Sequence, residues 1–217
     1  MTTKVKICGL TRPEDVQAAI GAGAALIGFI VDANSSRKLS VVEAAKLSLP
    51  AKNIVARVAV TVNADDALLT KIMSDMAPDY IQCHGDESAT RVADIARRFQ
   101  VKTIKAAAIA TPADMINAEQ YAGVADIMLY DAKPPKGENV RGGHGLSFDW
   151  NILMRAPRPK IWALAGGLTP ENAADAILKT NAPILDVSSG VEARAGVKDA
   201  LKIEAFMKAV KGMNANE

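Results

Sequence analysis

The sequence predicts an α/β fold, a single-domain (β/α)8 barrel of eight parallel strands that spans residues 1–217. Short apolar runs alternate with longer amphipathic runs along the whole chain, a pattern typical of parallel strands joined by crossover helices. Eight such apolar runs occur, and that number favours a closed barrel over an open doubly wound sheet. Because no low-complexity segment or linker divides the chain, we expect one domain.

The expected strands are short runs rich in branched apolar residues. They are residues 5–8, 25–31, 55–62, 80–84, 102–109, 126–132, 161–166 and 183–189. The segments between them carry apolar residues at helical spacing, among them residues 14–23, 66–76, 89–99 and 170–180.

Three threonines recur at the expected starts of helices. Thr11, Thr111 and Thr169 each follow a strand and stand one or two residues before a proline. Threonine can cap the free N–H groups of a helix, and proline fits an early helical position where no N–H is needed. Thr11 and Glu14 also have the spacing of a capping box.

Composition and charge limit the kinds of partner. With 26 Lys and Arg against 24 Asp and Glu, the formal charge is +2, which argues against a nucleic-acid or membrane-surface binder. Two cysteines without paired spacing indicate a reducing compartment. The N-terminus lacks an apolar signal region, and the longest apolar run, residues 18–31, is interrupted by glycines. We therefore expect a cytoplasmic protein.

Chemically reactive side chains are expected at the carboxyl ends of the strands, where barrel enzymes carry their sites. Cys8 ends the first strand and Asp131 ends the sixth, so they can face each other across a small substrate as a thiol and carboxyl acid–base pair. Alternation places Lys6 on the same side of its strand as Cys8, where it could favour the thiolate. The alternative is that Cys8 is a small buried apolar residue.

Glycine-rich turns indicate an anion site. Gly166-Gly167 follow the seventh strand and Ser189-Gly190 follow the eighth. Loops at these positions commonly bind phosphate through backbone N–H groups, so we expect a small phosphorylated metabolite as the ligand.

Other polar residues at the strand ends are open to two interpretations. Arg37 could bind a carboxylate or be a solvated loop charge, and His84 could carry a proton or serve the structure. Cys83 is interpreted as packing, and neither cysteine has a neighbouring ligand set for a metal. The polar, glycine-rich segment 132–146 is either a lid or a surface excursion.

The chain resembles the phosphoribosylanthranilate isomerase family of tryptophan biosynthesis. The resemblance rests on KICGLT, IQCHGDE, Asp131 with the following GGHGLSFDW, LAGGLTPEN and LDVSSGVEARAGVKD, in that order from residue 4 to about residue 206. It implies an Amadori rearrangement of N-(5-phosphoribosyl)anthranilate to 1-(2-carboxyphenylamino)-1-deoxyribulose 5-phosphate, without cofactor or metal.

The resemblance also implies roles for individual residues. Cys8 matches the general base that acts at sugar C2, and Asp131 matches the general acid that protonates the ring oxygen. Arg37 matches the arginine associated with the anthranilate carboxylate. The family's phosphate loops correspond to Gly166-Gly167 and Ser189-Gly190, and its further site positions to Asp186 and His84.

The sequence departs from the family pattern in two loops. Ser35-Ser36-Arg37 replaces the family's Ser-Pro-Arg, and His144 interrupts its usual GGTG.

A different phosphosugar enzyme is one rival function, either an epimerase or an aldolase that forms a Schiff base on Lys105. Another is a non-catalytic sensor of phosphorylated metabolites, which would need neither Cys8 nor Asp131. A monomer and a homodimer are both compatible with the sequence.

Overall fold

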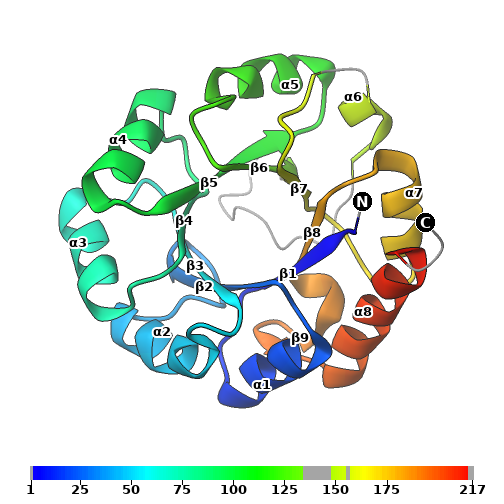
Figure 1. The fold of residues 1–217 in the computed structure, drawn as a ribbon, viewed down its shortest axis with the longest axis horizontal. Helices are drawn as coiled ribbons and strands as arrows, with labels where there is room; N and C mark the ends of the chain where they lie inside the picture. Colours follow the sequence, from blue (N-terminus) through cyan, green and yellow to red (C-terminus); the bar gives the residue numbers. More distant parts are fainter. Residues whose placement is uncertain (1, 134–147, 155–156, 215–217) are drawn as a thin grey trace.

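The protein is a closed barrel of parallel strands surrounded by helices (Figure 1). The computed structural model describes residues 2–133, 148–154 and 157–214. The barrel strands are β1 Lys4–Cys8, β2 Leu26–Asp32, β3 Ala56–Thr61, β4 Tyr80–Cys83, β5 Lys102–Ile109, β6 Ile127–Ala132, β7 Trp162–Leu164 and β8 Ile184–Val187. Their order around the barrel is their order along the chain, and β8 closes against β1. Each strand lies within two residues of its expected position, so the predicted fold class is confirmed.

The helices form an outer ring around these strands (Figure 1). They are α1 Pro13–Ala22, α2 Val41–Ser48, α3 Asp66–Asp75, α4 Ala89–Phe99, α5 Pro112–Ala118, α6 Asn151–Met154, α7 Ala173–Thr180 and α8 Ala200–Asn214. Short 3-10 turns lie at Leu49–Ala51 (η1), Glu119–Tyr121 (η2) and Ser189–Val191 (η3). None of the helices in the described ranges is long and apolar enough to cross a membrane.

Alternation along each strand separates two apolar clusters. In β1, Val5 and Ile7 pack in the larger cluster beneath the helices, while Cys8 belongs to the smaller cluster inside the barrel. β4 follows the same rule, because Ile81 and Cys83 pack outward. This period of two decides which side chains can reach the barrel mouth.

A buried ion pair closes the barrel at the seam between its first and last strands. Lys6 and Asp186 are register partners in the β1–β8 pair, and Lys6 Nζ lies 3.0 Å and 2.9 Å from the two carboxylate oxygens of Asp186. Lys6 is 1% exposed and Asp186 is 8% exposed. Burial alone would lower the pKa of Lys6, but the charge of Asp186 raises it above its ordinary value, so the lysine stays charged.

Two of the expected threonine caps are wrong. The N-cap of α1 is Arg12 without a side-chain cap, because the Thr11 hydroxyl instead donates to the carbonyl of Gly196. α7 begins at Ala173 rather than near Thr169, since Thr169–Asn172 form a preceding turn in which the Asn172 side chain accepts from the Thr169 N–H at 2.8 Å. The third start is as expected: α5 follows Thr111.

A short hairpin after β8 was not expected from the sequence. β9 (Glu192–Arg194) and β10 (Val197–Lys198) pair antiparallel beside the first helix (Figure 1). Two and three residues are too few for a period of two to be recognised. The hairpin nonetheless brings two buried charges, Glu192 and Lys198, toward the barrel mouth.

The substitution Lys6→Met is expected to lower the free energy of unfolding by about 3–5 kcal/mol at pH 7, because it leaves Asp186 buried without its partner. The deficit should shrink as the pH falls, since a lone buried carboxyl has a raised pKa and is readily protonated. Urea denaturation at several pH values measures both effects.

Lys71→Met is the matched control, because the Lys71–Asp75 pair is largely exposed. That substitution should change stability by less than about 0.5 kcal/mol. A Lys6→Met protein as stable as the wild type at pH 7 would show that the seam does not depend on this ion pair.

Candidate active site

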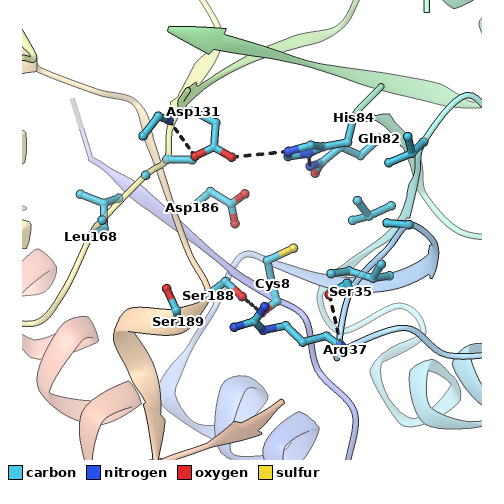
Figure 2. Close-up of a pocket in the computed structure, with 18 of the residues that line it drawn as sticks. Cys8, Ser35, Arg37, Gln82, His84, Asp131, Leu168, Asp186, Ser188 and Ser189 are labelled. Atoms are coloured by element: carbon cyan, nitrogen blue, oxygen red, sulfur yellow. Dashed lines mark hydrogen bonds and ion pairs between the residues drawn. The ribbon is translucent and has the colours of Figure 1, made fainter. Parts of the chain in front are cut away.

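One pocket at the carboxyl ends of the strands collects nearly all the residues that the sequence singled out. Its wall includes Cys8, Arg37, His84, Asp131, Gly166, Gly167, Asp186 and Ser189. Figure 2 shows the sulfur of Cys8 and the carboxylates of Asp131 and Asp186 directed into a shared space, with Arg37 below them. Gly190 is absent from the pocket lining among the described residues. Thiol, carboxyl, imidazole and guanidinium groups therefore surround one cavity.

Cys8 lies on the barrel axis side of β1, in contact with Lys6. A Cβ atom added to Gly28 of β2 would come within 2.8 Å of Cys8 Sγ and 3.3 Å of Lys6 Nζ, so both groups occupy the space that Gly28 leaves free. Burial raises the pKa of the Cys8 thiol, and the positive charge of Lys6 only partly counteracts it. Lys6 thus favours the thiolate of Cys8, as expected, but burial has the larger effect on the pKa.

Asp131 and His84 approach each other from β6 and the end of β4. His84 Nε2 lies 3.4 Å from one oxygen of Asp131, whose other oxygen accepts from the Ala132 N–H at 2.9 Å (Figure 2). Gln82 Nε2 lies 2.7 Å from His84 Nδ1. If the amide nitrogen donates there, the ring proton is on Nε2 and faces Asp131. The histidine thereby orients the carboxyl in the cavity.

Asp186 of β8 also lines the pocket. Figure 2 shows its carboxylate between Asp131 and Cys8. Burial raises the pKa of Asp186, Lys6 opposes that shift, and the nearby charge of Asp131 adds to it. Asp186 thus belongs both to the ion pair at the barrel seam and to the lining of the pocket.

Arg37 enters the pocket from the loop after β2, held by a residue that the sequence analysis missed. Its Nε and Nη2 donate to the two carboxylate oxygens of Glu192 at 2.7 Å and 2.8 Å. Gly9 makes room for it, because a Cβ there would lie 2.6 Å from Arg37 Cδ. Gly9 also has a φ of +74°, which an L side chain rarely adopts. The sequence contained both charges, but no local signal joined residues 37 and 192.

The two glycine-rich turns differ in what they offer a ligand. Gly166 and Gly167 both have positive φ, and a Cβ on Gly166 would lie 2.6 Å from Ala132 N. Ser189 lines the pocket from the η3 turn. Gly190 instead permits close packing of the two loops, because its Cβ would lie 1.8 Å from the carbonyl oxygen of Leu168. The need for glycine at position 190 is thus explained by packing.

Cys83 and Lys105 both lie outside this pocket. Cys83 is fully buried in the outer cluster, where burial raises its pKa to about 12, so its interpretation as packing is confirmed. Lys105 also points outward, and its Nζ donates to Gly85 O at 2.6 Å and to Glu87 Oε2 at 2.9 Å. The ammonium of Lys105 therefore fixes the loop that carries His84, and it lies away from the cavity.

Two further expectations concern a lid and a metal site. The segment interpreted as a lid, including His144, falls almost entirely on residues 134–147, which lie outside the described residues. Among the residues that are described, no group of three or more His, Cys, Asp or Glu side chains is placed to hold a metal ion.

Known proteins are similar to this chain in both sequence and fold. Residues 5–209 match the family model of N-(5'-phosphoribosyl)anthranilate isomerase. The chain belongs to that family. A Brucella canis protein named N-(5'-phosphoribosyl)anthranilate isomerase is 44% identical over 99% of this chain and 97% of its own length. The chain is thus an isomerase of tryptophan biosynthesis.

Solved structures agree with this placement. The phosphoribosylanthranilate isomerase of Thermotoga maritima is 35% identical and superposes with a TM-score of 0.87, over 97% of this chain and 99% of its own. Another structure of such an isomerase, in complex with reduced 1-(o-carboxyphenylamino)-1-deoxyribulose 5-phosphate, is 34% identical with a TM-score of 0.84, over 97% and 99% of the two chains. A 3-hexulose-6-phosphate synthase of Salmonella typhimurium, 13% identical with a TM-score of 0.68, covers 97% of this chain and 100% of its own and shares the fold alone.

The reactivity of Cys8 provides a test of its surroundings. In a Cys83→Ser background, the rate of alkylation by iodoacetamide should rise with pH and inflect above about pH 8.5, the value for an ordinary thiol. Mass spectrometry of the modified protein gives the rate. A Cys8→Ser protein should stay unmodified while folded, because Cys83 is 0% exposed and lies outside the pocket that Cys8 lines. An inflection below pH 8.5 would mean that the cations outweigh burial at Cys8.

Proposed function

We propose that the protein catalyses the Amadori rearrangement of N-(5'-phosphoribosyl)anthranilate with Cys8 as general base and Asp131 as general acid. The observation that carries the proposal is that the thiol and the carboxyl, from β1 and β6, line one pocket in a member of this isomerase family. Such a reaction protonates one substrate atom and deprotonates another, and two groups across a cavity suit that division.

The first step opens the sugar ring. Asp131 gives a proton to the ring oxygen, the bond between that oxygen and C1 breaks, and the anthranilate nitrogen supplies the electron pair that forms a C1–nitrogen iminium. His84, 3.4 Å from the carboxyl, keeps Asp131 directed at the cavity.

The second step removes the proton from C2. The neighbouring iminium makes this proton acidic, and the thiolate of Cys8 accepts it while the C–H electrons form the C1–C2 double bond of an enolamine. Proton transfer to C1 and loss of the C2 hydroxyl proton then give the ketone. Because burial raises the pKa of Cys8, kcat/KM should rise with pH until the free thiol is ionised.

The substrate's two acidic groups have separate binding partners in this proposal. The phosphate binds the turns at Gly166, Gly167 and Ser189, which line the pocket and can offer backbone N–H groups to an anion. The carboxylate of the aromatic ring binds Arg37, whose guanidinium forms part of the same wall. The complex of a related isomerase with a reduced carboxyphenylamino sugar phosphate supports a ligand of this kind. No cofactor takes part, and a cytoplasmic monomer or homodimer would suffice.

The rival functions find less support. A Schiff-base aldolase would need Lys105 in the cavity. Its Nζ instead contacts Gly85 O and Glu87 Oε2, outside the pocket. A non-catalytic sensor would have no need of both a thiol and a carboxyl directed at one bound sugar.

Cys8→Ser and Asp131→Asn are each expected to lower kcat by about 10²–10⁴-fold or more, because each removes a proton-transfer group while preserving its shape. Loss of substrate fluorescence measures turnover. The control is Cys83→Ser, since Cys83 packs outside the pocket and its loss should leave kcat near that of the wild type. Turnover at the wild-type rate in either of the two site variants would remove that residue from the mechanism.

A further inference from the structure

The β9–β10 hairpin holds a buried cluster of three charges against the pocket wall. Glu192 of β9 accepts from Arg37 through both oxygens, and its Oε1 also accepts from Lys198 Nζ of β10 at 2.8 Å. Arg37, Glu192 and Lys198 are 8%, 7% and 4% exposed. Three charges so deeply buried need a structural or functional reason.

The bidentate contact fixes which donors of Arg37 are left for a ligand. Glu192 takes the Nε–H and one Nη2–H, the side edge of the guanidinium. Within the described part of the chain no other group binds the end edge, made of Nη1 and Nη2, which can therefore bind a planar carboxylate in the pocket that Arg37 lines. Because a guanidinium is rigid, fixing one edge also fixes the direction of the other.

Neighbouring elements hold the hairpin itself in place. The Lys198 N–H donates to Asp15 of α1 at 3.1 Å, and Lys202 Nζ of α8 donates to the Glu192 carbonyl at 2.8 Å. The hydroxyl of Thr11, which the sequence predicted as a helix cap, binds the Gly196 carbonyl in the hairpin turn instead. Contacts with Asp15, Lys202 and Thr11 therefore fix the hairpin that carries Glu192, independently of its contact with Arg37.

The cluster also carries a formal excess of positive charge, although burial lowers the pKa of Lys198 and the charge of Glu192 only partly opposes that shift. Lys198 Nζ has three oxygen neighbours, Glu192 Oε1 and both the carbonyl and hydroxyl of Ser188, which suits an ammonium with three protons. Two cations then share one carboxylate, for a net charge of +1. A buried excess charge beside a cavity favours an anionic ligand group.

We propose that Glu192 and Lys198 are positioning residues that aim Arg37 and thereby make the site selective for a substrate with a carboxylate on its aromatic ring. This inference rests on the proposed function, since it takes Arg37 as the carboxylate's partner. Glu192 sets the direction of the free guanidinium edge. Lys198 holds Glu192 against Ser188 and supplies the uncompensated charge.

The test compares two ligands that differ only in that carboxylate. One is reduced 1-(o-carboxyphenylamino)-1-deoxyribulose 5-phosphate, and the other is the same compound with a plain phenyl ring. Isothermal titration calorimetry with wild-type protein and with Glu192→Gln, Lys198→Met, Arg37→Ala and Arg37→Ala/Glu192→Gln gives the dissociation constants. Glu192→Gln should weaken the carboxyphenyl ligand about tenfold and leave the phenyl ligand unchanged.

The remaining variants separate positioning from a general loss of structure. Lys198→Met should show the same selective weakening, and it serves as the second variant if Glu192→Gln folds poorly. In the Arg37→Ala background, Glu192→Gln should have no further effect on the carboxyphenyl ligand. Glu204→Gln makes the same chemical change on the exposed face of α8 and should alter neither ligand.

Four outcomes would overturn the proposal. Equal weakening of both ligands by Glu192→Gln would mean a structural role, and tighter binding of the carboxyphenyl ligand would mean that Glu192 merely competes for Arg37. An undiminished effect in the Arg37→Ala background would show that Glu192 does not act through Arg37. A wild-type protein that binds the two ligands equally would overturn the assignment of Arg37 in the proposed function as well.

Discussion

The ion pair between Lys6 and Asp186 is the interaction on which the rest of the structure depends. It joins the first and last strands at the barrel seam, with Lys6 Nζ 3.0 Å and 2.9 Å from the two carboxylate oxygens. The same lysine shares the space above Gly28 with the sulfur of Cys8. Closure of the barrel and the electrostatics of the thiol are thus linked through one side chain.

Acidic and basic side chains lie on different walls of the pocket above this ion pair. Asp131 and His84 form the wall from β6 and β4, while Arg37, held by Glu192 and Lys198 behind it, forms a cationic wall on another side. Asp186 lies between the two, held by Lys6 (Figure 2). A substrate with an acidic aromatic ring at one end and a ring oxygen to be protonated at the other fits this arrangement, because each end meets a group of complementary chemistry.

The sequence predicted the barrel and its mouth well, because both follow from patterns repeated along the chain. Apolar runs located every strand of the barrel, and the rule that barrel sites lie at strand ends brought Cys8 and Asp131 together. Contacts between distant segments were not predictable in this way. Thr11 fits a helix cap by local spacing, yet it bonds to Gly196, and Glu192 reaches Arg37 across 155 positions. Gly190 resembled a phosphate-loop glycine, and only the fold shows how tightly it packs on Leu168.

The most direct test of the account is a crystal structure of the wild-type protein with the reduced carboxyphenylamino sugar phosphate bound. The account predicts that Cys8 Sγ contacts C2 of the sugar chain, while a carboxyl oxygen of Asp131 lies within about 3 Å of the C4 hydroxyl, which derives from the ring oxygen. A complex in which the sulfur and the carboxyl both face the same atom, or in which either is turned away from the sugar, would contradict it.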